Sequence, residues 1–215
     1  KTPENTLLIT EYGRSAIRVF DLEKQVLSRV FSNYSTNLSS SLMPPLVVSG
    51  SAILTNAGNS TIAKMPYSTM WNTFSWRRSD TTRRAGFGTY LSGKVYIPDT
   101  VNNQVVVLNT NTGLFENEIN LGGGSTGSRT AINVSGFIFV ATDTSIVKIN
   151  PATSGIVGYY SGGVNHRGLV YDNNGYIWTN NVTNSSLHKV DVNTLSGTIY
   201  SSVFSTSAHA TGSMC

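Results

Sequence analysis

Charged residues are scarce in this chain. Asp, Glu, Lys and Arg make up 12% of its 215 residues, about half the share found in typical globular proteins. Cysteine is nearly absent, and because the single Cys215 has no second cysteine to pair with, no internal disulfide holds the fold. Since 39% of the residues are hydrophobic, the chain can still fill a core. We therefore expect a folded protein that is stabilised by packing.

Long apolar runs are missing too, because no stretch of about 18 consecutive apolar residues occurs. Lys1 opens the chain without a basic segment followed by an apolar one. We therefore expect neither a signal peptide nor insertion into a membrane. The sequence has no initiator Met, and we expect a processed or excised fragment.

Basic residues outnumber acidic ones by 15 to 11, but they are scattered along the chain. The adjacent pairs are Arg77–Arg78 and Arg83–Arg84, and no dense basic run follows that would track a phosphate backbone. We therefore expect no nucleic-acid partner. A weakly charged surface rich in hydroxyl and amide groups is typical of extracellular and virion-surface proteins, and we expect that setting.

What the chain does contain is an internal repeat. Each unit reads as a short apolar strand, a polar turn, a second strand, a turn that often contains Thr and Gly, and a third strand. The five units begin at Thr6, Ala52, Val95, Ile138 and Ile177. Their spacing of about 40 residues is typical of β-propeller blades, and the pattern requires no helix.

A further apolar segment precedes each unit after the first, so a complete unit has four strands. These segments end at Gly50, Gly93, Gly136 and Gly175. The C-terminal segment 209–215 (HATGSMC) matches that inner strand, whereas the first unit lacks one. We therefore predict one all-β domain, residues 1–215: a five-bladed β-propeller of four-stranded antiparallel blades. Pairing of the C-terminal strand with the N-terminal blade would close the ring.

The recurring pattern is a glycine followed by an aromatic or aliphatic strand, then a strand, a turn and a glycine. Examples are GKVYIPD from Gly93, GYIWTNN from Gly175, VVVLNTNTG and LHKVDVNTLSG. This pattern resembles the NHL and YVTN-type β-propeller repeats over almost the whole chain. The resemblance implies the propeller fold, and it says little about activity because it rests on spacing and residue class.

In such a ring, the inner strands begin on the face where the second strands end, around the mouth of the central channel. The positions just before the inner strands are Met43, Arg84, Arg129, Arg167 and His209. Three guanidinium groups at equivalent positions predict a partial cationic ring that would hold a carboxylate, sulfate or phosphate. Arg129 and Arg167 are the sharper candidates, because we find no acid partner for them within their own blades. His166 would join them at acid pH.

The second strands end on the same face with polar residues, namely Glu11, Asn56, Asp99, Thr142 and Asn181. We include Asn181 in the predicted ligand site. Two alternatives stay open. The charged residues would have a structural role if Arg84 pairs with Asp99 and His209 with Glu11. Alternatively, Glu11, Asn56 and Asp99 would bind a divalent cation, as in the sugar-lactonase-like propellers that this chain resembles in strand pattern.

Residues for catalysis are few. His166, His188, His209 and one terminal cysteine give no zinc cluster and no Cys–His pair, and we expect an outward or inter-blade role for His188. The aromatic residues of segment 71–76 would either pack between blades or stack on a sugar ring. The glycine-rich loop 120–128 would form a mobile lip over the channel.

These features predict a non-enzymatic binding module that needs no cofactor. Its ligand would be a glycan or an acidic surface group, as for a receptor-binding domain of a virion or phage or a secreted lectin-like protein. The predicted ligand-binding residues are Arg84, Arg129, Arg167, His209 and Asn181. A metal-dependent lactonase- or lyase-like enzyme and a protein-interaction scaffold are the alternatives, and the oligomeric state is open.

Overall fold

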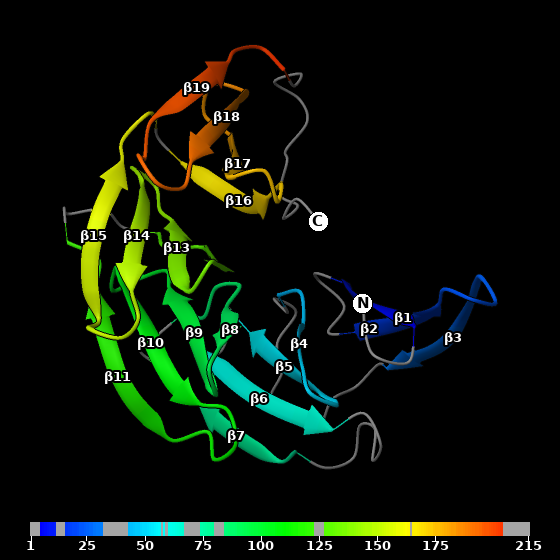
Figure 1. Cartoon of the computed structure of the whole chain (residues 1–215). Coiled ribbons are helices and arrows are strands. Elements are labelled where there is room, and N and C mark those ends of the chain that lie inside the picture. The colour runs from blue at the N-terminus through cyan, green and yellow to red at the C-terminus, as the bar shows by residue number, and fades with distance from the viewer. Residues whose placement is uncertain are drawn as a thin grey trace.

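The computed structural model describes residues 5–11, 16–31, 43–56, 58, 60–66, 74–79, 84–122, 127–163 and 165–203. Over these ranges the chain forms nineteen β-strands and no helix. The strands build five antiparallel sheets, arranged around a central space as the blades of a propeller (Figure 1). The predicted all-β, five-bladed fold is thus confirmed. Within the described ranges, no helix is long and apolar enough to cross a membrane.

The strands follow one another within each blade from the inside outward. Blade 1 comprises β1 (Thr6–Glu11), β2 (Ala16–Asp21) and β3 (Val26–Phe31). Blade 2 comprises β4 (Leu46–Val48), β5 (Ser51–Asn56), β6 (Thr61–Pro66) and β7 (Trp76–Ser79). Blade 3 comprises β8 (Thr89–Leu91), β9 (Lys94–Asp99), β10 (Gln104–Asn109) and β11 (Phe115–Asn120).

The last two blades have the same order. Blade 4 comprises β12 (Thr130–Val134), β13 (Phe137–Ala141), β14 (Ile146–Asn150) and β15 (Gly155–Tyr160). Blade 5 comprises β16 (His166–Tyr171), β17 (Tyr176–Asn181), β18 (Ser186–Asp191) and β19 (Gly197–Tyr200). The segment 209–215, predicted to add a fourth strand to blade 1, lies outside the described residues, so that pairing stays a prediction.

Tight turns explain the glycine that ends each inner segment of blades 2–4. The turn residues are Ser49–Gly50, Ser92–Gly93 and Ser135–Gly136, and all six have positive φ. Two consecutive residues with positive φ are the mark of the type I′ turn, whose twist matches that of the two strands it joins. Glycine adopts this conformation without steric penalty because it has no Cβ.

Asp and Asn side chains form the turns that precede the outermost strand of a blade. Asp21 Oδ1 accepts hydrogen bonds from the backbone N–H groups of Glu23 and Lys24, at 3.0 and 2.9 Å. Asp191 Oδ1 accepts the N–H groups two and three residues later in the same way. Side chains that bond their own backbone two residues on are the common basis of such turns.

The apolar core lies between neighbouring blades. Val107 of blade 3 and Ile138 of blade 4 belong to one buried cluster, and Phe139 of blade 4 and Ile177 of blade 5 belong to the next. Burying one such side chain completely contributes about 1.5–3 kcal/mol. The blades therefore hold one another in place, and their inner ends are set around the central channel.

Lysines of the third strands also connect blades. Lys148 Nζ of blade 4 donates to the carbonyl of Val192 in blade 5, at 2.7 Å. Lys64 Nζ of blade 2 donates to the carbonyl of Thr110 in blade 3, at 3.2 Å. Each contact joins one blade to the turn that follows the third strand of the next blade.

Candidate functional site

Two of the predicted arginines lie close together at the mouth of the channel. Arg129 directly precedes β12, and Arg167 is the second residue of β16. Thr130 Oγ1 donates to the carbonyl of Arg167 at 2.6 Å, which links the inner strands of blades 4 and 5 where they begin. The structure thus brings the two sharper candidates to one place.

Asp143 completes this group. Its Oδ1 lies 3.3 Å from Arg129 Nε in an ion pair, and both side chains are about one-third exposed. The expectation that Arg129 has no acid partner within its own blade is therefore wrong. Asp143 was missed because it lies in the turn between β13 and β14, beyond the strand ends that the sequence comparison aligned.

Arg167 interacts with both members of the pair. Its pKa is lowered, first by burial and then by the positive charge of Arg129, while the carboxylate of Asp143 acts in the opposite direction. The Asp143 carboxylate offsets one of the two guanidinium charges, which leaves one positive charge in excess. Because the groups are partly desolvated, this charge acts more strongly on a ligand than it would in water.

The remaining residues of the predicted ring are placed differently. Arg84 is exposed, and its backbone carbonyl accepts the N–H of Thr100 at 2.9 Å. Within the described ranges no ion pair joins Arg84 to Asp99. Met43 is half-buried, and its N–H donates to the carbonyl of Thr55. His209 lies outside the described residues.

The polar residues that end the second strands cap turns. Asn56 Oδ1 accepts the N–H of Gly58 at 2.8 Å. Asp99 Oδ1 accepts the N–H groups of Val101 and Asn102, at 3.0 and 3.2 Å, and Oδ2 accepts the Asn102 side-chain amide. The oxygens proposed as metal ligands are thus engaged in local structure, as expected for strand-end Asp and Asn.

For Glu11, the structure describes the strand but not the side chain. In the part of the chain that the structure describes, no group of three or more His, Cys, Asp or Glu side chains is placed to hold a metal ion. The metal alternative therefore gains no ligand set from the described residues.

Asn181 and His166 face blade 4. Asn181 is 1% exposed, and its Oδ1 accepts the N–H of Thr183 at 3.0 Å. His166 is fully buried, and burial, followed by the charge of His188, lowers its pKa to about 4. The expectation that His166 joins the arginines at acid pH is therefore wrong.

The described aromatic residues of segment 71–76 pack between blades. Trp76 Nε1 donates to the carbonyl of Thr110 at 2.9 Å, and its ring packs against the core cluster of blades 2 and 3. Phe74 packs against the cluster of blades 1 and 2. Trp71 and residues 123–126 of the predicted lip lie outside the described residues.

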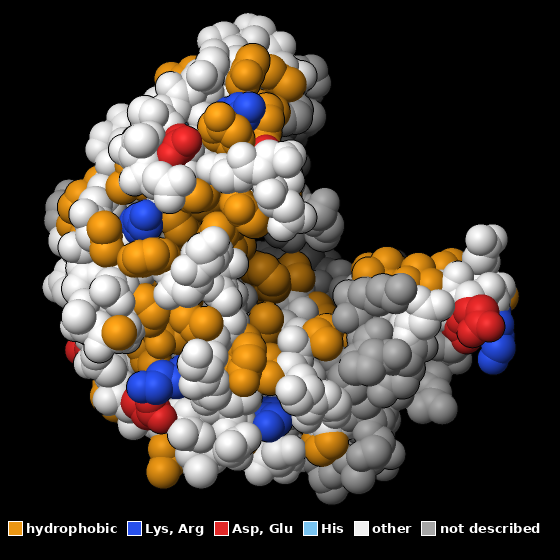
Figure 2. Space-filling view, in the orientation of Figure 1, with side chains coloured by type: hydrophobic (Ala, Val, Ile, Leu, Met, Phe, Trp, Pro, Cys, Tyr) orange, Lys and Arg blue, Asp and Glu red, His pale blue; other side chains and the backbone are white. Residues whose placement is uncertain are grey.

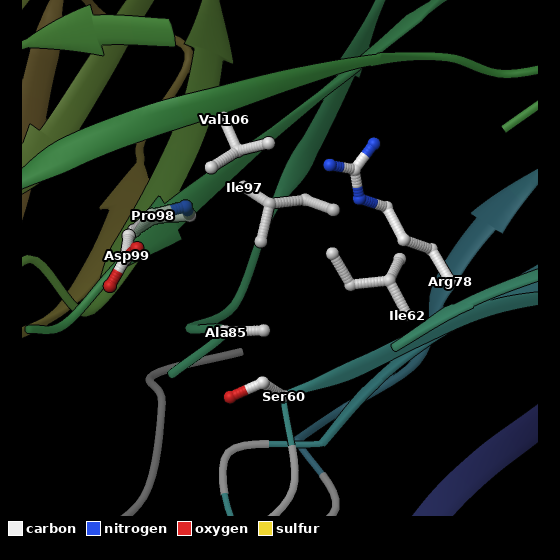
Figure 3. Close-up of a pocket in the computed structure, with 8 residues that line it drawn as sticks. All are labelled: Ser60, Ile62, Arg78, Ala85, Ile97, Pro98, Asp99 and Val106. Carbon is white, nitrogen blue, oxygen red and sulfur yellow. The ribbon is translucent and has the colours of Figure 1, made fainter. Parts of the chain in front are cut away.

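A narrow cleft between blades 2 and 3 was not foreseen from the sequence (Figure 3). It measures about 290 Å³ with the open solvent at its mouth, less than most pockets that enclose a small-molecule ligand. Its lining residues are Ser60, Ile62, Arg78, Ala85, Ile97, Pro98, Asp99 and Val106. Most of them are aliphatic, and the Asp99 carboxylate is committed to its turn, so the cleft offers a ligand few polar partners.

The face seen in Figure 2 carries few charged side chains, which are scattered singly or in pairs of opposite charge among hydrophobic and neutral polar groups. This agrees with the low charge content of the sequence. Against such a background, two neighbouring arginines are a local concentration of charge.

Solved structures with the same fold have varied functions. A streptogramin B lyase structure matches with a TM-score of 0.80 and 14% identity, over 95% of this chain and 68% of that one. BamB from Moraxella catarrhalis matches with a TM-score of 0.60 and 16% identity, over 91% and 58%. The Pan2 WD40 domain of Neurospora crassa matches with a TM-score of 0.68 and 15% identity, over 91% and 61%. All three are β-propellers.

At these identities the likeness shows the fold alone. This chain spans 58% to 68% of the length of those three structures. No protein-family model matches the sequence, and no curated protein matches it. The resemblance to NHL and YVTN repeats is thus confirmed at the level of a β-propeller and no further.

Proposed function

We propose that this protein is a non-enzymatic binding module that recognises an anionic group at the mouth of its channel, between blades 4 and 5. The observation that carries the proposal is the cluster of Arg129, Arg167 and Asp143, in which the one carboxylate pairs with Arg129 and offsets only one of the two guanidinium charges. A carboxylate, sulfate or phosphate of the ligand would supply the missing negative charge. An acidic glycan presents such groups beside hydroxyls.

Recognition of this kind makes no covalent bond. A guanidinium group forms two parallel hydrogen bonds to a planar or tetrahedral anion, which fixes its orientation as well as its position. Arg84, exposed at the equivalent place in blade 3, is the third cationic group that an extended acidic ligand would meet. The proposed setting outside a cell rests on the low-charge, hydroxyl-rich composition.

The test is calorimetric titration with inorganic sulfate and with a sulfated oligosaccharide. The Arg129→Ala, Arg167→Ala double variant should bind at least tenfold more weakly, because each charge-assisted hydrogen bond contributes about 1.5–3 kcal/mol. The matched control is Lys24→Ala, Lys94→Ala, which removes the same charge at exposed positions elsewhere and should leave affinity within about twofold.

Asp143→Asn should strengthen binding of the same probes, since it frees Arg129 from its ion pair. Equal binding by the wild type and the double arginine variant would refute the site. Metal analysis of the purified protein tests the enzyme alternative, because a stoichiometric divalent ion would favour it.

A further inference from the structure

A layer of buried polar side chains lies between blades 4 and 5. Its members come from three strands of blade 5, and each is at most 1% exposed: His166, Thr179, Asn181, Ser186 and His188. In the strand register His166 pairs with Asn181, and His188 pairs with Thr179. Paired residues of neighbouring strands project to the same side, so the five side chains share the face toward blade 4.

His188 is fully hydrogen-bonded in this layer. Its Nδ1 lies 2.9 Å from the hydroxyl of Tyr160 in blade 4, and its Nε2 lies 2.7 Å from Ser186 Oγ. Ser186 donates its own proton to Asn184 Oδ1, so His188 Nε2 donates to Ser186 and Tyr160 donates to Nδ1. The serine is thus not positioned to give its proton to the histidine, and the expected inter-blade role of His188 is confirmed.

His166 is the opposite case. Its ring centre is 5.0 Å from that of His188, yet neither of its ring nitrogens has a hydrogen-bond partner among the described residues. Thr179 Oγ1 and Asn181 Nδ2 are buried as well, and neither has a partner in the part of the chain that the structure describes. A buried polar atom that lacks a partner is rare in folded proteins, and an ordered water is the usual reason.

We propose that this layer is a binding site for ordered water, in which at least one water molecule bridges His166 to Asn181 Nδ2. The pairing of the two residues across neighbouring strands places their polar ends within reach of one bridging molecule. Thr179, on the same face, supplies a hydroxyl that both donates and accepts.

The chemistry of the unpartnered atoms selects this ligand. Asn181 Nδ2 is an amide NH2 group and can only donate, and the acceptor of the same side chain, Oδ1, is engaged in its turn. A neutral imidazole offers one donor and one acceptor. A metal ion would be repelled by the Asn181 N–H group, which has no lone pair to offer it. An anion would be repelled by the lone pair of the imidazole ring. A neutral molecule that donates and accepts suits all of these atoms, and the lowered pKa of His166 keeps its ring neutral near pH 7.

The equivalent position in the preceding blade supports this reading. Ser128 occupies the place before Arg129 that His166 occupies before Arg167, and it is fully buried too. Its hydroxyl bonds directly to the carbonyl of Asp99 in blade 3, at 2.6 Å. Blades 3 and 4 are thus joined there by a direct side-chain bond, whereas the His166 ring has no such bond among the described residues and is left to bind water.

The direct test is a high-resolution crystal structure of the whole chain. We expect a fully occupied water 2.7–3.2 Å from a ring nitrogen of His166 and from Asn181 Nδ2. An empty layer would overturn the proposal, and so would anomalous scattering from a bound metal after soaking with Zn²⁺.

Thermal unfolding of two variants tests the same site in solution. His166→Leu removes the water's partner and leaves Asn181 and Thr179 unbonded, so we expect a melting temperature at least 2–4 °C lower than that of the wild type. His166→Ser restores the residue found in blade 4 and should melt above His166→Leu. A His166→Leu variant as stable as the wild type, or more stable, would show that the layer is dry.

Discussion

At the residue scale, Lys148 is a buried charged residue whose amine bonds to a backbone carbonyl of the next blade. The side chain is 7% exposed, its Nζ is bonded to the Val192 carbonyl, and it lies 4.5 Å from the ring centre of Phe137. Replacing Lys148 by Met keeps most of the apolar stem but leaves that carbonyl without its partner. We predict a loss of about 1–3 kcal/mol in the free energy of unfolding, measured in urea. Lys24→Met, at an exposed side chain, should change it by less than about 0.5 kcal/mol.

Local chemistry also explains which site residues the sequence could place. Asp21 and Asp191 each end a strand, where short polar side chains commonly form turns, and both bond to the backbone of the turn that follows. Asp99 and Asn181 do the same at the other end of the blades, although their alignment around the mouth suggested ligands. A backbone N–H two residues away competes successfully with a distant ligand for a short side chain.

At the scale of elements, the turn between β10 and β11 fits against the preceding blade. Gly113 has φ +70°, and a Cβ there would lie 2.5 Å from the Trp76 ring. Gly136 has φ +83° with nothing within 4 Å of its Cβ position. Gly136→Ala should therefore cost only the backbone strain, about 1–2 kcal/mol. Gly113→Ala should cost more and should shift the fluorescence of Trp76; equal losses for the two variants would contradict this contact.

The strands themselves were predictable, because alternating apolar residues bounded by Gly, Asn and Asp set their positions. The inner strand of blade 3 was not, since β8 covers only Thr89–Leu91 of the expected segment. Before it, Phe87 donates its N–H to the carbonyl of Arg129 in blade 4, at 2.8 Å. Gly86 permits this approach, because a Cβ there would clash with the Arg129 carbonyl. Contacts between blades of this kind leave no periodic signal in the sequence.

At the scale of the whole molecule, three turns that precede the outermost strand of a blade are built alike. The N–H groups of Leu22, Thr110 and Val192 donate to the carbonyls of Asn5, Gly93 and Gly175, at 2.9–3.1 Å. The carbonyls of Thr110 and Val192 each accept a lysine amine from the preceding blade. In a ring, the blade that precedes blade 1 is blade 5, and Figure 1 shows these two blades at the ends of the row.

Lys189 is the residue of blade 5 that matches Lys64 and Lys148. Its Nζ lies 3.8 Å from the ring centre of Tyr176, and no carbonyl accepts it among the described residues. If the C-terminal segment closes the ring, the Leu22 carbonyl becomes its acceptor. Lys189→Met should then lower the free energy of unfolding of the full chain by about 1–3 kcal/mol, the loss predicted for Lys148→Met. The same substitution in a chain that ends at residue 203 should cost less than about 0.5 kcal/mol, because the closing strand is gone.

The measurement is urea unfolding of four proteins: the full chain and the chain that ends at residue 203, each with and without Lys189→Met. Comparing them gives the cost of the substitution in each background. Equal costs in the two backgrounds would show that Lys189 does not depend on closure, and a cost that rises with protein concentration would place the acceptor in a second copy of the chain.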